Sequence, residues 1–263
     1  MGTDSDRNFI ERLTWDEVAR RIAKGATAIL PIGAAAKQHG FHLPLNTDRI
    51  QAERFAAKLA ERIDALIWPA LSYGYYPAFT EYAGSSSLSA STFEAVAHEI
   101  AAGILDSGCQ KLFVLNTGIS TLAPVERALA RLDTGKVMHL RIHDGPRYRR
   151  AAEALAAQSH GSHADELETS LMLALAPHLV DMVRAEASPA LIHETPGHLT
   201  PSDKNSPNYS RSGSYGDPTL ATPAKGDILL AAILDDLNEQ VAAFMAETSA
   251  AKPRSNPIRS LSQ

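Results

Sequence analysis

Cysteine and long apolar runs are both scarce in this chain. Cys109 is the single cysteine among 263 residues, which excludes an internal disulfide and a zinc site built from several thiolates. No apolar stretch approaches the roughly 18 residues that a membrane-spanning helix needs. Residues 1–12 are polar and lack the apolar centre of a signal peptide. We therefore expect a cytoplasmic protein with no membrane partner.

Positive charge is also scarce. The chain has 25 Lys and Arg against 30 Asp and Glu, a net charge of -5, and its basic residues form no block. Nucleic-acid binding draws most of its affinity from neutralised phosphates, so we expect no nucleic-acid partner. Hydrophobic residues, in contrast, make up 44% of the chain, which is enough to bury the core of one large domain.

Strand-like and helix-like segments alternate along the chain. The predicted strands are Thr27–Ile32, Leu66–Pro69, Lys111–Asn116 and Val137–Ile142. The predicted helices run from Thr14 to Gly25, over about 47–63, 91–108, 122–132 and 164–176, and from Pro223 onward. This alternation predicts a single-domain α/β fold, with a mostly parallel central sheet and helices on both faces. We expect this domain to span residues 11–248, with tails at 1–10 and 249–263 and a long loop at 189–215.

Two helix starts carry a specific sequence signal. Thr14 with Glu17, and Ser91 with Glu94, have the spacing of a capping box, in which a hydroxyl and a carboxylate satisfy free backbone N–H groups. Both pairs predict the first residue of a helix.

The densest polar cluster follows the first predicted strand. Lys37, His39, His42 and Asp48 lie within twelve residues of one another. Active sites in parallel sheets form at the carboxyl ends of strands. Imidazole and carboxylate together are normal ligands for Zn²⁺, Mn²⁺ or Fe²⁺. A surface loop with incidental histidines is the alternative, and spacing alone does not separate the two.

A second cluster opens the helix predicted near residue 164. Asp165 and Glu166 are ordinary acidic residues for a first helical turn. His163 and Glu168 would diverge by more than about 100° on one helix, so they share a site only if His163 precedes the helix. The turn after the third strand, Asn116–Thr121, could present backbone N–H groups to a substrate oxygen. The sequence contains no phosphate-loop, GxSxG or HExxH pattern.

Five blocks of sequence together resemble the creatininase (creatinine amidohydrolase) family. Residues 31–48, PIGAAAKQHGFHLPLNTD, are similar to the family signature PxGSxEQHGPHLPLxTD. The later blocks are YAGSSSL at 82–88 after Tyr73-Gly74, FVLNTGIST at 113–121, HADELETSLML at 163–173, and SYGDPTLATPAKG at 214–226. They resemble the family's FPGTxSL, NGHGGN, HAGExETSLML and GxYGDPxxAxxxxG elements, in the same order.

The resemblance implies hydrolysis of a C–N amide bond in a small molecule, at a metal site on an α/β fold. It also implies a homo-oligomer, which is often a hexamer in the family. His163 matches the family histidine ahead of the ETS helix, which implies proton transfer or substrate orientation. The expected substrate-binding residues are His42, Asn116, Gly118 and Tyr82. Tyr75, Tyr76 and Phe79 form an aromatic cluster with Tyr82 that we expect to pack the loop.

Two positions depart from the family pattern, and the resemblance assigns both to one of two metals. The family's glutamate and histidine ligands for that metal are replaced by Lys37 and Gly118. The other metal keeps its implied ligands His39, Asp48 and Glu168. We therefore expect a site for one divalent ion, Zn²⁺, Mn²⁺ or Fe²⁺, with Lys37, His163 and Glu168 as catalytic residues.

The role of Lys37 admits several hypotheses. Its ammonium could take the position of the lost metal and pair with Asp48, acting as an oxyanion donor or in proton transfer. The alternative is a lysine that points into solvent from a decayed site. A metal-independent enzyme that uses Lys37 as a base or Schiff-base lysine is another hypothesis, and a non-catalytic subunit is a third.

Overall fold

A parallel four-stranded sheet forms the centre of the molecule, in the order β2-β1-β3-β4. The computed structural model describes residues 7–188 and 198–250. The strands are β1 (Thr27–Ile32), β2 (Ala65–Ile67), β3 (Leu112–Asn116) and β4 (Val137–Arg141). Pairing of β1 with β3 brings Ile32 beside Asn116, so the carboxyl ends of these two strands lie together at one edge. The predicted α/β fold with a parallel sheet is confirmed.

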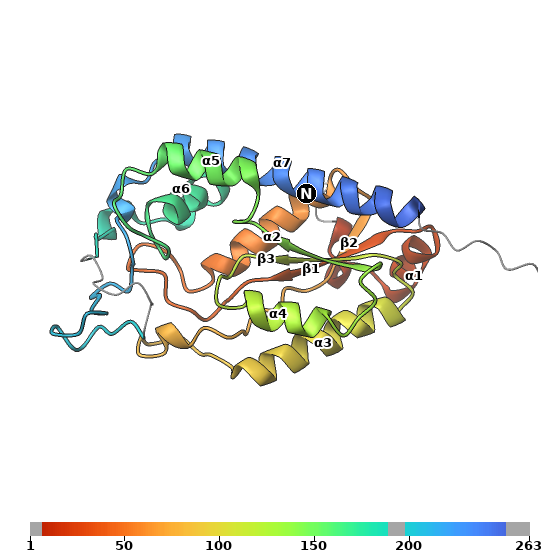
Figure 1. The fold of residues 1–263 in the computed structure, drawn as a ribbon, viewed down its shortest axis with the longest axis horizontal. Helices are drawn as coiled ribbons and strands as arrows, with labels where there is room; N and C mark the ends of the chain where they lie inside the picture. Colours follow the sequence, from red (N-terminus) through yellow and green to blue (C-terminus); the bar gives the residue numbers. More distant parts are fainter. Residues whose placement is uncertain (1–6, 189–197, 251–263) are drawn as a thin grey trace, which may run out of the picture.

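Helices cover both faces of this sheet (Figure 1). One face carries α2 (Thr47–Ala60), α5 (Pro146–Leu155), α6 (Glu166–Leu175) and α7 (Pro223–Ala250), and the other carries α3 (Ala90–Asp106) and α4 (Leu122–Leu129). The first helix, α1 (Trp15–Ala23), lies near the amino ends of the strands. Short 3₁₀ turns are η2 (Ile10–Arg12), η3 (Pro77–Phe79), η4 (Pro177–Leu179), η5 (Met182–Arg184) and η6 (Pro218–Leu220).

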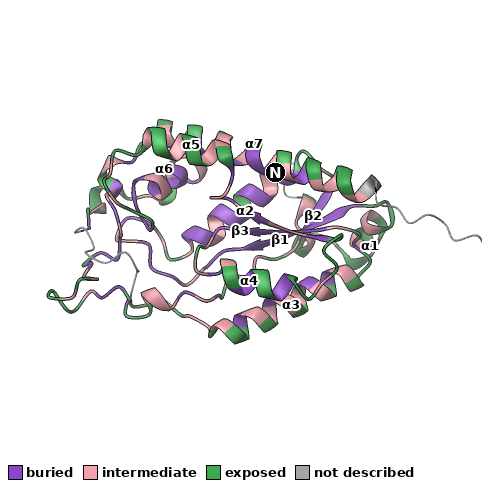
Figure 2. Cartoon of the chain, in the orientation of Figure 1, coloured by how far each residue is buried: buried purple, intermediate pink, exposed green. Residues whose placement is uncertain are grey.

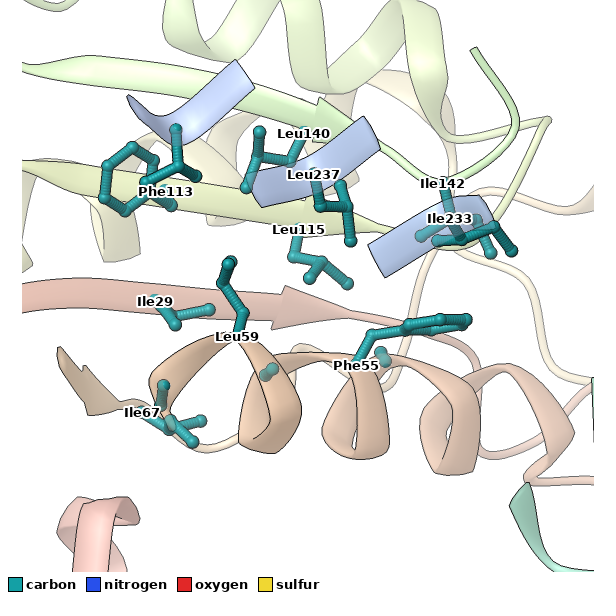
Figure 3. Packing of buried hydrophobic residues seen from close by; sticks show 14 of the residues in the cluster. Ile29, Phe55, Leu59, Ile67, Phe113, Leu115, Leu140, Ile142, Ile233 and Leu237 are labelled. Atoms are coloured by element: carbon teal, nitrogen blue, oxygen red, sulfur yellow. The ribbon is translucent and has the colours of Figure 1, made fainter. Parts of the chain in front are cut away.

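Each sheet face has its own hydrophobic core. The strands β1, β2 and β3 are buried throughout (Figure 2), as expected for a sheet sandwiched between helices, and the edge strand β4 is partly buried. Ile29, Phe113 and Leu115 point toward α2 and α7, where Phe55 and Leu237 meet them (Figure 3). Alternate residues of the same strands face α3 and α4. Burial on both faces holds the strand ends, and the loops that leave them, in fixed positions.

Local signals decide some helix starts and distant contacts decide others. The Thr14–Glu17 capping box is present at the start of α1, as predicted. The prediction for α3 was wrong by two residues, because the cap is Ser89, whose hydroxyl accepts the N–H of Thr92. The helix α5 was not predicted. Its first turn is capped from α7, where Asp236 accepts the N–H groups of residues 147 and 148.

Some predicted segments fall partly outside the described residues. These are most of both tails and positions 189–197 of the predicted long loop. Phe9, within the predicted N-terminal tail, pairs with Ile67 and packs on the core. The rest of the long loop folds back, and Tyr215 pairs with His163 in an antiparallel bridge. Within the described residues, no helix is long and apolar enough to cross a membrane.

Candidate active site

The polar cluster lies where the loop after β1 meets the first turn of α2. The loop supplies Lys37 and His39, and Asp48 is the second residue of α2. The loop is held by backbone bonds: the N–H of Lys37 donates to the Leu45 carbonyl at 3.2 Å. Thr117, which follows β3, donates its hydroxyl to the backbone carbonyl of Asp48 at 3.1 Å. Two strand ends therefore fix the position of the Asp48 carboxylate.

Asp48 lies between two different neighbours. Its Oδ2 atom is 2.7 Å from Lys37 Nζ, and its Oδ1 atom is 3.0 Å from His39 Nε2. All three side chains are almost fully buried. Burial alone would raise the pKa of Asp48, but the Lys37 ammonium beside it holds the pKa well below its usual range. The carboxylate therefore stays charged, and the hypothesis that Lys37 points into solvent is wrong.

The orientation of His39 leaves one nitrogen in need of a positive charge. His39 Nδ1 lies 2.9 Å from the Lys37 backbone carbonyl, which can only accept, so Nδ1 carries the proton. A neutral imidazole then presents the lone pair of Nε2 to Asp48 Oδ1 at 3.0 Å and to Glu168 Oε1 at 3.8 Å. A lone pair facing two carboxylates requires a further proton or a metal ion. Backbone fixation of the distal nitrogen is typical of metal-binding histidines.

Glu168 reaches the same place from α6. Asp165 caps this helix by accepting the N–H groups of residues 167 and 168, so His163 precedes the helix, as a shared site requires. His163 Nδ1 lies 3.8 Å from Glu168 Oε2. That same oxygen accepts the N–H of Ala164 at 2.6 Å, and Ala164 has a left-handed φ of 46°. A strained residue of this kind often marks a functional turn, and here it orients Glu168.

His163 has the same construction as His39. Its Nε2 atom lies 2.9 Å from the Gln38 carbonyl and therefore donates, which leaves the lone pair on Nδ1. Burial, and then the nearby charge of Lys37, hold the pKa of His163 well below its ordinary value. A neutral His163 can accept a proton or bind an ion through Nδ1.

These side chains fit a divalent metal ion. One ligand atom each from His39, His163 and Glu168 lie within 4.8 Å of one another. Ligand bonds of roughly 2.0–2.1 Å in a tetrahedral zinc site place neighbouring ligand atoms about 3.3 Å apart. The separations of Asp48 Oδ1 and Glu168 Oε1 from His39 Nε2, 3.0 and 3.8 Å, bracket that value. The set is mixed in nitrogen and oxygen, which suits Zn²⁺, Mn²⁺ or Fe²⁺.

A small cavity lies on the Lys37 side of Asp48. Its volume of about 10 Å³ is roughly what one water-sized atom needs, and it is lined by Lys37, Asp48, Tyr76, Gly118, Ser120, Thr121 and five apolar or glycine residues near the strand ends. A Cβ on Gly118 would lie 2.8 Å from Thr121 Oγ1, so the loop is closed around a glycine. Phe79 walls the adjacent side, with its ring 5.1 Å from Lys37 Nζ and 4.3 Å from the His163 ring.

The four residues predicted to bind substrate differ in their surroundings. Gly118 lines the cavity. The other three have polar atoms bonded within the protein: His42 Nε2 contacts Thr169 Oγ1 at 2.8 Å, Asn116 Oδ1 accepts from Gly118 and Thr121, and Tyr82 donates to the Ser210 carbonyl. The second ring nitrogen of His42, Nδ1, is buried and makes no hydrogen bond with the described residues. Burial lowers the pKa of His42 to about 4 and raises that of Tyr82. These contacts hold the α6 helix, the β3 turn and the late loop around the site.

Several site residues were missed by sequence reasoning. Tyr76, expected only to pack, lines the cavity with its hydroxyl buried and without an acceptor for its proton among the described residues. Gln51 donates to Glu168 Oε1 at 3.3 Å. His143 follows β4; burial lowers its pKa while the carboxylates of Glu168 and Asp48 act in the opposite direction. The position of His143 just beyond a strand end was the signal that could have identified it.

Comparison with known proteins agrees with this geometry. A family model described as creatininase, creatinine amidohydrolase, matches residues 11–241. The chain belongs to the creatininase family. A creatinine amidohydrolase from Pseudomonas putida is 29% identical over 245 residues, which cover 84% of this chain and 91% of that protein. A mycofactocin precursor peptide peptidase from Mycobacterium tuberculosis is 29% identical over 235 residues, covering 83% and 86%. Both names describe hydrolysis of a C–N bond.

Solved structures of creatininases share the fold. One described as a manganese form superposes with a TM-score of 0.78 at 26% identity, covering 90% of this chain and 98% of that one. A mutant described as a Zn–Zn type gives 0.76 at 26% identity, covering 89% and 97%. These two creatininase structures are described with manganese and with zinc, and the fit of the present side chains to an ion is consistent with that kinship.

Proposed function

We propose that this protein hydrolyses a C–N amide bond of a small cyclic or formyl amide, using one divalent metal ion and the Lys37 ammonium in place of a second. His39, Asp48 and Glu168 hold the ion in this proposal, and His163 carries the proton. The substrate class and the metal come from kinship with amide hydrolases and from the donor set. Homo-oligomeric assembly and a cytoplasmic location remain predictions.

One observation carries the proposal. His39 Nε2, with its lone pair, faces the carboxylates of Asp48 and Glu168 while its other nitrogen is fixed by a carbonyl. Such a convergence of acceptors is stabilised by a cation. A bound ion of this kind lowers the pKa of a coordinated water molecule and polarises a carbonyl oxygen.

The residues of the chain supply the rest of the chemistry. In the overall reaction, the water oxygen bonds to the carbonyl carbon, the C–N bond breaks, and the leaving nitrogen takes up a proton released by the water. His163 Nδ1 is free to hold that proton, because its Nε2–H is committed to the Gln38 carbonyl. The Lys37 ammonium stabilises negative charge that develops on the carbonyl oxygen. Phe79 shields both groups from bulk water.

The ion pair of Lys37 argues against the metal-independent alternative. The contact of 2.7 Å with Asp48, in a buried setting, stabilises the charged ammonium. A charged ammonium is neither a base nor a nucleophile. A Schiff base forms from a neutral amine, so Lys37 would first have to lose its proton and, with it, the ion pair to Asp48.

Chelation and reconstitution test the proposal. Protein is stripped of metal, refilled with Mn²⁺, Zn²⁺ or Fe²⁺, and assayed on creatinine, N-formyl amides and short peptides. We expect hydrolysis of at least one amide, its loss on chelation and its return with metal. Hydrolysis that persists in chelator, or the absence of any bound ion after refilling, would contradict the proposal.

A further inference from the structure

We propose that the cavity beside Lys37 is an oxyanion subsite, in which the Lys37 ammonium and the Tyr76 hydroxyl donate together to the amide carbonyl oxygen. The proposal rests on the proposed function for the identity of that oxygen. The two donors, the Lys37 ammonium and the Tyr76 hydroxyl, belong to the chain, so the subsite does not depend on a bound metal ion.

Tyr76 is the unusual feature of this cavity. The residue is 2% exposed, and among the residues that the structure describes its hydroxyl has no acceptor for its own proton. Buried tyrosine hydroxyls normally find a partner, because an unpaired one loses its bonds to water without replacement. Burial raises the pKa of Tyr76, while the backbone N–H of Gly74 acts in the opposite direction by donating to the hydroxyl oxygen. The net shift is upward, so the hydroxyl keeps its proton and remains a donor.

Lys37 has donor capacity left as well. An ammonium carries three N–H bonds, and Asp48 Oδ2 is the ion-pair partner that the described residues provide. The Phe79 ring faces the ammonium at 5.1 Å and accepts no conventional hydrogen bond. At least one N–H is therefore available to a ligand.

The cavity offers few free acceptors to match these donors. Both Asp48 oxygens are committed: Oδ2 pairs with Lys37, and Oδ1 faces the proton or metal ion that His39 Nε2 requires. The Thr121 hydroxyl is within 2.9 Å of both Asn116 Oδ1 and the Gly118 carbonyl, which it can serve as donor. The Ser120 hydroxyl, which can donate or accept, is the remaining polar side chain of the lining. A lining in which Lys37 and Tyr76 offer unmatched donors favours an incoming oxygen that only accepts, such as an amide carbonyl.

The charge of that oxygen changes during the reaction. When the water oxygen bonds to the carbonyl carbon, the carbonyl π electrons move onto the oxygen, which becomes an oxyanion. Two donors fixed before the reaction stabilise this state more than the neutral carbonyl. Collapse of the oxyanion re-forms the C=O bond as the C–N bond breaks, and the donors are returned unchanged.

Formate binding tests the subsite without requiring turnover. The protein is labelled with ¹⁵N-lysine, and the Lys37 ammonium resonance, assigned by its absence in Lys37→Arg, is followed during titration with sodium formate at constant ionic strength. Sodium chloride serves as the control titrant. We expect a saturable shift with formate, and an affinity about five- to tenfold weaker in Tyr76→Phe, the loss of one hydrogen bond. Tyr75→Phe, at a residue that does not line the cavity, keeps the wild-type affinity.

The alternatives give different results. No saturable formate shift, or equal affinity in wild type and Tyr76→Phe, would overturn the subsite. Thermal unfolding adds a second criterion, because removing a hydroxyl whose proton has no acceptor leaves Tm unchanged or raises it. A marked fall in Tm would mean that Tyr76 donates within the protein, and would also overturn it. Absence of bound metal would defeat the proposed function and leave the formate result standing.

Discussion

The two oxygens of the buried Asp48 carboxylate have different neighbours to balance their negative charge. On one side, Oδ1 faces His39 Nε2 together with Glu168, where a cation must be supplied. On the other, Oδ2 faces Lys37, whose cation is covalently attached. In the proposed function, a metal ion binds on the first side and Lys37 takes the place of one on the second. The comparison shows that one oxygen of a buried carboxylate can be neutralised by a lysine of the chain while the other faces a histidine and a second carboxylate.

The largest effect is expected on the metal side. His39→Ala removes the central ligand of the site, so we expect loss of the bound ion and a fall in amide hydrolysis of about 10³-fold or more, equivalent to ~4 kcal/mol. Elemental mass spectrometry and the amide assay measure the two losses. The matched control His98→Ala changes a histidine that contacts the Ala128 carbonyl, away from the site. Full metal content in His39→Ala would show that the ion lies elsewhere.

Replacement of Lys37 should lower the free energy of unfolding. Lys37→Met leaves Asp48 as a buried carboxylate without its ammonium, and breaking a buried pair costs about 3–5 kcal/mol. Urea unfolding at pH 7 measures the free energy of unfolding. Lys225→Met is a stringent comparison, since it breaks the ion pair of a half-buried lysine with the buried Glu166. A loss below about 1 kcal/mol in Lys37→Met would mean that another cation already neutralises Asp48.

A substitution of His163 tests whether this residue binds the metal ion or carries the proton. In His163→Asn, we expect metal content to stay near that of wild type, while kcat falls about 10²-fold because proton transfer is lost. Elemental analysis and steady-state kinetics on one preparation give both numbers. Loss of the ion would instead make His163 the third ligand, which its place beside His39 and Glu168 also allows.

The smallest effect is an acid-dependent loss of stability from His42, which supports α6 behind the site. Burial lowers its pKa in the folded protein to about 4, whereas the unfolded chain binds the proton near pH 6.5. Unfolding is therefore favoured as the pH falls from about 6.5 to 4, by at most about 1.4 kcal/mol per pH unit for this side chain. Urea titrations across that range should show a shallower decline in His42→Gln. An equal decline would assign the effect to other groups.

Sequence reasoning succeeded where the determinants were local. The strands and the Thr14–Glu17 cap depend on neighbouring residues, and both were predicted. The helix α5 was missed because its cap, Asp236, is far away in sequence. Spacing also could not tell whether His163 lay before α6 or on it; the Asp165 cap decides this.

The site was predictable in its acidic and basic residues and not in its aromatic ones. Lys37, His39 and Asp48 lie in one short segment, and their pairing follows from the loop folding back on α2. Tyr76 is similar in sequence context to Tyr75, and nothing local states which ring enters the cavity. A buried hydroxyl without an acceptor for its proton becomes visible only when every nearby donor and acceptor has been placed.

Metal stoichiometry tests the central claim most directly, that one cation is bound and the other is Lys37. Elemental mass spectrometry on protein purified without chelator should give about one ion per chain in wild type. Restoring the family residues in Lys37→Glu/Gly118→His, where Thr121 must shift to admit the new side chain, should raise it toward two. Zero or two ions in the wild type, or a folded double variant that still binds one, would contradict the account.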